Sequence, residues 1–298
     1  MELIRTRLLE HLRGEVGERI YYQKAADDVA LEKNYPQIIL SAEKFTDAVH
    51  GVSGLLTAEI ICSQESKPEP IEKKLRASLE GVFFRGEEIF LLKWQRTELF
   101  EEPASERTPL IIGMAVTFAI YEFPSARTVA PDIIEGLESW ALELDAVIIG
   151  VTDFGEVFEP RRETPAIYFS VEEVRTARQL NAAVFYTAKV RLHLFAPKVR
   201  ERRAWLSAIN NELHFIKAIK LDDGSPARLQ GTQYDLRRDE IAGQIEMTLE
   251  YGARRRFDYT HGLRRHVSTT KTAADRKSAV AARENMDVFQ RGMRSTGS

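Results

Sequence analysis

The sequence predicts an α+β protein made of two tandem copies of a mainly antiparallel sheet with two helices packed on one face. Three observations predict this fold class. The chain repeats itself at an interval of about 129 residues, each copy contains two amphipathic helices, and most strands follow one another without a crossover helix.

The repeat is clearest around two prolines. Pro36–Glu43, PQIILSAE, aligns with Pro165–Glu172, PAIYFSVE, at an offset of 129 residues. Further matches at an offset of 130 are Thr57-Ala58 with Thr187-Ala188, Gly113 with Gly243, and Tyr121 with Tyr251. In the last strand the alternating apolar faces agree better at 129. We therefore align the last strands of the two copies by their apolar faces, unless one copy contains a bulge.

Each copy is expected to contain two helices. The first helix has apolar residues at spacings of three and four, which mark one buried face: Ile4, Leu8 and Leu12 in the first copy, and Ile133, Leu137 and Ala141 in the second. A loop of about twenty residues should follow. The second helix begins after a proline; the expected ranges are Ile71–Gly81 and Val199–Leu213.

The strands are predicted from alternation and from their flanking turns. A short strand should begin after Pro36 or Pro165. The expected second strands are Leu55–Cys62 and Val184–Phe195, and the closing strands are Leu110–Phe123 and Ile241–Tyr251. Between the second helix and the closing strand, the first copy shows a strand at Ile89–Trp94, and the second shows a turn at Asp222–Pro226.

The expected domains are residues 1–125, residues 126–259 and a basic C-terminal arm over 260–298. Net charge is −6 over 1–125, −2 over 126–260 and +5 over 261–298. The arm lacks a hydrophobic period and should be largely disordered, with a short helix near Ala279–Gln290. It is either a docking segment that orders on assembly or a solvated tail.

Composition excludes several classes of protein. The chain has 298 residues, 44% of them hydrophobic, and a net charge of −3, which is ordinary for a globular protein and unlike a basic nucleic-acid binder. No apolar stretch is long enough to cross a bilayer, so we expect no membrane partner, and the N-terminus does not resemble a signal peptide. The single cysteine, Cys62, indicates a reducing compartment.

No catalytic, cofactor or metal motif is present in the sequence. It contains no glycine-rich phosphate loop and no nucleophile elbow, and its histidines lack a zinc-binding spacing. We expect Cys62 to be a buried, inert thiol and Asp222-Asp223 to serve a turn. Glu43 and Glu172, at equivalent repeat positions, should form structural hydrogen bonds or interface ion pairs. We therefore predict that the protein is not an enzyme and binds no cofactor.

The candidate functional residues are basic. His193 falls on the polar face of the Val184–Phe195 strand and is expected to be solvated or at an interface. The candidates for contact with a protein partner or with DNA in a lumen are Arg175, Arg178, Arg191, His193, Arg254, Arg255, Arg256, Arg264 and Arg265.

Over about residues 1–255 the chain resembles the tail terminator, or tail completion, proteins of long-tailed bacteriophages and the cap proteins of contractile injection systems. In the second copy the resemblance rests on the strand Thr164–Glu172, the strand Val184–Phe195, the helix Val199–Leu213, the turn Leu221–Gly224 and the strand Ile241–Tyr251. In the first copy it rests on Tyr35–Glu43 and Ile112–Phe123. Family members often carry one such unit, whereas this chain carries two.

The resemblance implies a virion protein of the tail or neck, assembled in the host cytoplasm. It would form a ring that caps the head-proximal end of the tail tube, ends tube growth and joins the tail to the head connector. The implied partners are further copies of the chain, the tail tube protein, the head connector or neck proteins and the sheath, with DNA passing through the lumen without specific binding. We expect six chains per ring because the two copies differ in charge; the alternative is three chains that alternate the copies.

The sequence is also compatible with other classes of function. A neck or head-completion ring, or a tail-tube ring, would have the same architecture. A nucleic-acid-binding adaptor would use the arginines after the last strand and lose affinity steeply with salt. An enzyme would need a catalytic constellation that the sequence does not show.

Overall fold

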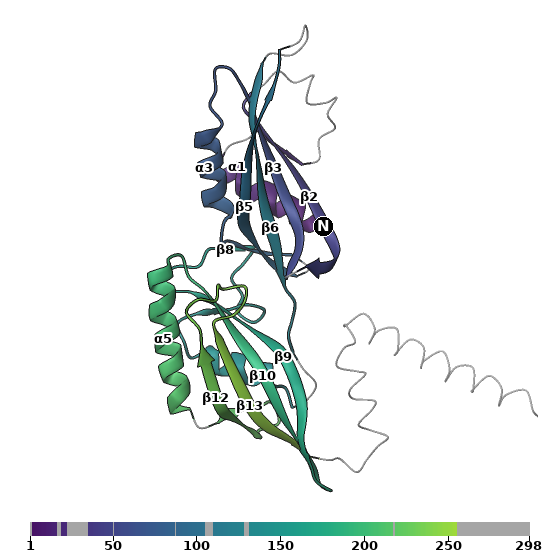
Figure 1. The fold of residues 1–298 in the computed structure, drawn as a ribbon, viewed down its shortest axis with the longest axis vertical. Coiled ribbons are helices and arrows are strands. Elements are labelled where there is room, and N and C mark those ends of the chain that lie inside the picture. Colours follow the sequence, from purple (N-terminus) through teal and green to yellow (C-terminus); the bar gives the residue numbers. More distant parts are fainter. Residues whose placement is uncertain are drawn as a thin grey trace, which may run out of the picture. The chain divides into compact units, whose positions relative to one another are not determined.

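The computed structural model describes residues 2–16, 19–22, 35–49, 51–86, 88–104, 110–127, 131–216 and 218–254. These residues form two sheets and four helices, which confirms the α+β class (Figure 1). Grouped by their contacts, Met1–Arg175 and Thr187–Tyr251 form one unit that holds the body of both sheets. Thr176–Tyr186 and the described residues from Gly252 to Arg254 belong to the other.

The first sheet has seven strands in the order β1-β2-β3-β6-β5-β4-β8. Its elements are α1 (Glu2–Glu15), β1 (Ile20–Tyr22), β2 (Gln37–Val49), β3 (Val52–Ser63), α3 (Glu69–Leu79), β4 (Phe83–Arg85), β5 (Ile89–Glu102), β6 (Ile111–Phe123) and β8 (Val157–Phe158). Both helices pack on one face: Leu8 of α1 and Leu75 of α3 share one buried cluster with alternate residues of the strands, such as Ile60, Val116 and Phe118.

The second sheet has six strands in the order β11-β12-β13-β10-β9-β7. Its elements are α4 (Ile133–Ala141), β7 (Val147–Ile148), β9 (Ala166–Gln179), β10 (Ala183–Phe195), α5 (Val199–Phe215), β11 (Ile219–Lys220), β12 (Pro226–Tyr234) and β13 (Ile245–Arg254). Leu206, Ile209 and Leu213 form the buried stripe of α5, whereas Trp205 is half-buried and donates to the Arg162 carbonyl at 2.8 Å.

The two sheets have the same topology, which confirms the tandem repeat. Each strand of the second sheet has a counterpart at the same place in the first: the order β7-β9-β10-β13-β12-β11 corresponds to β1-β2-β3-β6-β5-β4. The first sheet contains one further strand, β8. In both sheets a short strand runs parallel to the long strand beside it, β1 to β2 and β7 to β9. The predicted boundary near residue 125 falls between the last strand of one sheet and the first helix of the other.

The register of the closing strand follows the apolar faces, as predicted, but with a different offset. A bulge lies after Trp94, which pairs with Phe118, and an equivalent bulge lies after Leu229, which pairs with Leu249. Aligning the bulges matches Phe118 with Leu249, an offset of 131 rather than 129. Both bulges lie in the strand that pairs with the closing strand, in β5 and in β12, so neither closing strand contains an extra residue. The Gly and Tyr matches at an offset of 130 are therefore coincidental.

Several expected elements are longer or more numerous than the sequence suggests. The strands after Pro36 and Pro165 are not short: β2 and β9 have 13 and 14 residues. The predicted loops contain the short strands β1, β7 and β8. The Asp222–Pro226 turn leads into a strand of 9 residues, β12. Strands of two or three residues escape prediction because they form only through pairing with a distant segment.

One strand of the second half completes the first sheet. Val157 and Phe158 of β8 pair with Phe84 and Phe83 of β4. Phe83 also contacts Phe195 of β10, with ring centroids 5.0 Å apart, and both belong to a buried cluster with residues of both sheets. The two repeats are therefore joined by a shared aromatic core as well as by the linker.

Candidate protein-interaction site

His193 is not solvated, contrary to the sequence-based expectation. Its side chain lies on β10 and is only 7% exposed. Nε2 lies 2.8 Å from Oγ of Ser170 on β9, and Nδ1 lies 2.9 Å from the carbonyl oxygen of Glu240. The segment before β13, which contains Glu240, buries the imidazole, and no local pattern in β10 reveals this.

The Ser170–His193 pair resembles a nucleophile and its base, but its electrostatics favour a structural role. A carbonyl at Nδ1 requires the N–H there, so Nε2 accepts from the Ser170 hydroxyl. Burial, aided by the positive charge of nearby Arg191, lowers the pKa of His193 from 6.5 to about 4, which makes the ring a weak base at neutral pH. The orienting group is a neutral carbonyl rather than a carboxylate. The pair therefore ties β9 and β10 to the segment around Glu240.

Arg191 is engaged within the chain. Its guanidinium lies 2.7 Å from Glu172 and 3.7 Å from Glu246, and it donates to the Ala242 carbonyl at 3.3 Å. The repeated glutamate of the Pro165–Glu172 motif thus forms an ion pair within the chain, where the sequence led us to expect a structural hydrogen bond or an ion pair at an interface. Arg191 and His193 lie together on the second sheet, but neither offers an unengaged side chain to a partner.

Arg175, Arg178 and Arg254 are exposed. Arg175 pairs with Glu173, and the Arg178 guanidinium lies 4.4 Å from the centre of the Phe185 ring. From Val174 to Lys189 the β9–β10 hairpin contains basic residues and no acidic residue, and Val174 and Leu180 are exposed. The candidates Arg255, Arg256, Arg264 and Arg265, and the predicted helix near Ala279–Gln290, lie outside the described residues.

Both sheets have long strand edges without a partner strand in the described part of the chain. β7 pairs only with Ala166 and Ile167 of β9, so β9 from Tyr168 to Gln179 has a free edge. β4 pairs only with Ile89–Leu91 of β5, which leaves Lys93–Glu102 free. β1 and β11 likewise cover only the starts of β2 and β12. Long free edges are templates for strand addition.

The last part of β5, Thr97–Glu102, is acidic and partly apolar. Glu98, Glu101 and Glu102 are exposed, and Leu99 is 71% exposed, the second-highest value among the large hydrophobic side chains described. Opposite charges thus lie at the ends of two free edges. The end of β5 carries three glutamates after Lys93 and Arg96, and the end of β9 carries Arg175 and Arg178 after two glutamates. Sequence reasoning missed this because it requires knowing which strands lie at an edge.

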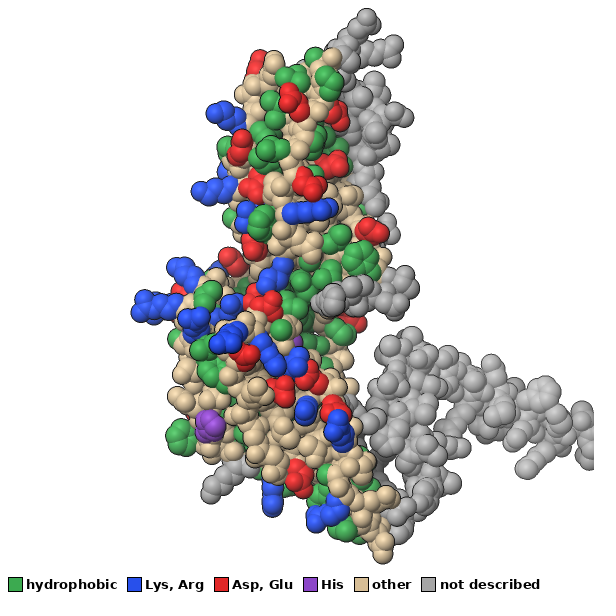
Figure 2. All heavy atoms as spheres, in the orientation of Figure 1, with side chains coloured by type: hydrophobic (Ala, Val, Ile, Leu, Met, Phe, Trp, Pro, Cys, Tyr) green, Lys and Arg blue, Asp and Glu red, His purple; other side chains and the backbone are tan. Residues whose placement is uncertain are grey.

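A second basic surface, also missed from the sequence, lies at the start of α5. Figure 2 shows Lys and Arg side chains gathered at the upper end of this helix. The exposed members are Arg161, Arg162, Lys198, Arg200 and Arg203. Glu159 and Glu163 are exposed near them, so the net positive charge of this surface is moderate.

A cleft of about 630 Å³ lies between α3 and the start of α5. At its base the Glu240 carboxylate bridges Lys93 of β5, at 2.6 Å, and Arg202 of α5. Its lining holds four basic and four acidic side chains, so it favours neither an anion nor a cation: Lys73, Arg76, Lys93 and Arg202, and Glu72, Glu80, Glu159 and Glu240.

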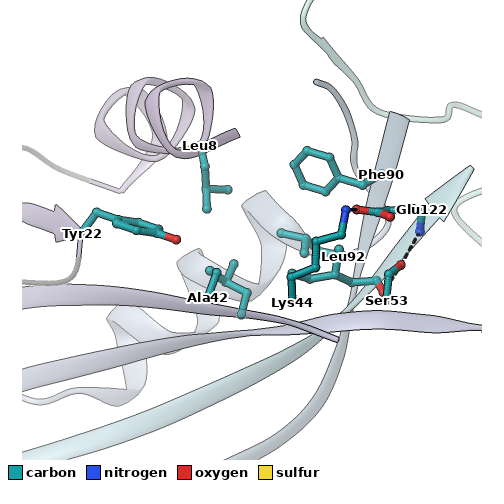
Figure 3. A pocket seen from close by; sticks show the side chains of 10 residues that line it. Leu8, Tyr22, Ala42, Lys44, Ser53, Phe90, Leu92 and Glu122 are labelled. Carbon is teal, nitrogen blue, oxygen red and sulfur yellow. Dashed lines mark hydrogen bonds and ion pairs between the residues drawn. The ribbon is translucent and has the colours of Figure 1, made fainter. Parts of the chain in front are cut away.

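A second cavity lies beneath α1 and is too small for a ligand (Figure 3). Leu8 and Tyr22 point into it, and Lys44 and Glu122 meet beside it at 2.7 Å. Its volume of about 20 Å³ accommodates one water-sized molecule.

The remaining residues considered from the sequence have structural surroundings. Cys62 is fully buried, as predicted, and burial raises the pKa of its thiol. Asp223 accepts from the Ser225 amide at 2.8 Å, which confirms its role in the turn, whereas Asp222 accepts from the Asp132 amide at 2.9 Å and ties the turn to the start of α4. Among the described residues there is no cluster of three potential metal ligands and no helix long and apolar enough to cross a membrane.

Comparison with known proteins adds no relative: no protein-family model, curated protein or solved structure matches the chain.

Proposed function

We propose that this protein is a structural, non-enzymatic virion protein of the phage tail or neck. Copies of the chain would form a ring on the head-proximal end of the tail tube, end its growth and receive the head connector. The sheath is a further partner where the tail is contractile, and DNA passes through the lumen without specific binding. Assembly takes place in the host cytoplasm.

The observation that carries this proposal is the set of free strand edges on two sheets of identical topology. Backbone N–H and C=O groups along an exposed edge favour pairing with another strand. A chain whose interacting edges lie at different places on its surface forms heterologous contacts, and such contacts close into a ring when the rotation between copies is right. The resemblance to tail terminators provides the identity of the assembly.

The test is electron microscopy of the purified chain, alone and mixed with tail tubes assembled from the cognate tube protein. We expect closed rings confined to one end of each tube and tubes that stop elongating. A variant that lacks the hairpin tip, residues 176–182, serves as the matched control and should cap fewer ends. Tubes that keep growing with bare ends would contradict the proposal, and indefinite polymers of the chain would favour a tail-tube protein instead.

The number of chains per ring is part of the same measurement. The charge difference between the repeats favours six chains, each using its two repeats for different contacts. The identical topology of the repeats also permits three chains in a pseudo-six-fold ring. With 34.0 kDa per chain, native mass spectrometry separates about 204 kDa from about 102 kDa.

The basic surface at the start of α5 favours a second candidate function, a nucleic-acid-binding adaptor. Exposed arginines and lysines from two segments can contact successive phosphates. Reversing the charge of Arg200 and Arg203 should then abolish DNA binding, and wild-type affinity should fall steeply between low and physiological salt. Salt-insensitive or absent binding would leave the ring proposal as the better one.

A further inference from the structure

We propose that the free edge of β9 in one copy pairs antiparallel with the free edge of β5 in a second copy. This inference rests on the proposed self-assembly and specifies its contact. Four strands offer free edges among the described residues, and their charges select one combination. The last part of the β9 edge, Val174–Gln179, carries Arg175 and Arg178 and no acidic residue, and the last part of the β5 edge, Thr97–Glu102, carries Glu98, Glu101 and Glu102 and no basic residue. Within the chain Arg175 pairs with Glu173 and Glu98 pairs with Arg96, and these exposed pairs would be exchanged for pairs between copies.

The other combinations show weaker complementarity. The β12 edge carries only Arg228, so pairing it with β9 would place basic residues together, and pairing it with β5 would set a single basic residue against three acidic ones. The described β2 edge carries Glu43 beside Lys44 and would meet the acidic β5 edge without a net attraction. Like charges directly opposite each other destabilise a strand pair, whereas opposite charges stabilise it.

The register follows from the spacing of the charges. Arg175 and Arg178 are three residues apart, as are Glu98 and Glu101. In an antiparallel pair, one register places Arg178 opposite Glu98 and Arg175 opposite Glu101, with Ala177 opposite Leu99. Residues three apart in a strand point to opposite faces, so each ion pair lies on its own face of the joined sheet. We choose the antiparallel orientation because it is the more stable per residue.

This contact would place first and second repeats in alternation along a row of chains. The second repeat of one copy meets the first repeat of the next. Such a head-to-tail contact is compatible with a ring of three chains and with a ring of six, and the mass of the ring separates the two.

Disulfide trapping tests the register. One chain carries Ala177→Cys and the other Leu99→Cys, and Cys62 stays in place because it is buried. Directly opposed strand residues have Cα atoms about 4.5–5.5 Å apart, within disulfide range. We expect a covalent dimer of the two chains under mild oxidation. Thr176→Cys mixed with Leu99→Cys is the matched control, because Thr176 points to the other face, and it should give no dimer.

Charge reversal tests the chemistry. Adding R175E and R178E to the Ala177→Cys chain should reduce trapping about tenfold or more, because acidic residues then face Glu98 and Glu101. Adding E98R and E101R to the Leu99→Cys chain should restore it. All four charged residues are exposed, so the variants should keep the wild-type melting temperature.

Each outcome has a defined meaning. Absence of the Ala177–Leu99 dimer, equal trapping of Thr176→Cys, or no response to charge reversal overturns the proposed pairing. Rings on tube ends without the dimer would leave the proposed function standing. Trapped dimers without rings on tubes would support the pairing and contradict the function.

Discussion

The carbonyl oxygen of Glu240 lies 2.9 Å from Nδ1 of His193, and the carboxylate of the same glutamate lies 2.6 Å from Nζ of Lys93. A single residue in the segment before β13 therefore binds a side chain of the second sheet and also joins that sheet to the first.

Stability should fall below neutral pH because of His193. Its pKa is about 4 in the folded chain and 6.5 when unfolded, so between these values the unfolded chain binds a proton that the folded chain does not. The free energy of unfolding should drop by about 2 kcal/mol between pH 7.5 and pH 5. Urea denaturation at the two pH values measures this drop. His193→Gln should lack it, and a variant that retains the full drop would assign the titration to another group.

Removing the Glu240 carboxylate should weaken the joint between the repeats. Glu240→Ala leaves Lys93 and Arg202, which are both mostly buried, without a shared partner. We expect a loss of about 2 kcal/mol, reduced from the cost of a fully buried pair because the site is partly solvated. Glu135→Ala breaks the exposed pair with Arg127 and should cost less than about 0.5 kcal/mol. Equal losses in thermal unfolding would show that burial does not strengthen the Glu240 contacts.

Cys62 should contribute packing only. Cys62→Ala should cost about 1–2 kcal/mol, whereas Cys62→Ser should cost more because it buries a hydroxyl. The thiol should react with Ellman's reagent only after denaturation, since it is buried and its pKa is raised. Loss of assembly in Cys62→Ala at unchanged stability would contradict this role.

Gly113 should tolerate no side chain. A Cβ at this position would lie 2.2 Å from Phe100 Cζ and 2.7 Å from the Ile60 carbonyl oxygen, and the latter cannot rotate away. Gly113→Ala should therefore destabilise the chain by about 2 kcal/mol or more. Gly231→Ala is the matched control on β12, where nothing lies within 4 Å of the added atom, and its effect should stay within about 0.5 kcal/mol. A neutral Gly113→Ala would show that the strands can shift.

The amino-acid sequence by itself determined the duplication, the α+β class, the helices and the buried faces of the long strands. These are local properties: Leu8 and Leu12 on α1, or Val190 and Leu192 on β10, lie at the spacing that one buried face requires. The proline before the helix and the acidic turn at Asp222-Asp223 also express backbone preferences that act within a few residues.

Only the tertiary structure decided which strands lie at an edge, which polar side chains are buried and how the repeats join. β8 is two residues long and exists because β4, more than seventy residues earlier, pairs with it. His193 has the pattern of an exposed strand residue and is buried by a segment 47 residues further along the chain. The free edges of β5 and β9 depend on where β4 and β7 end. These features arise from contacts between distant segments, whose free energies are set by the packed chain as a whole.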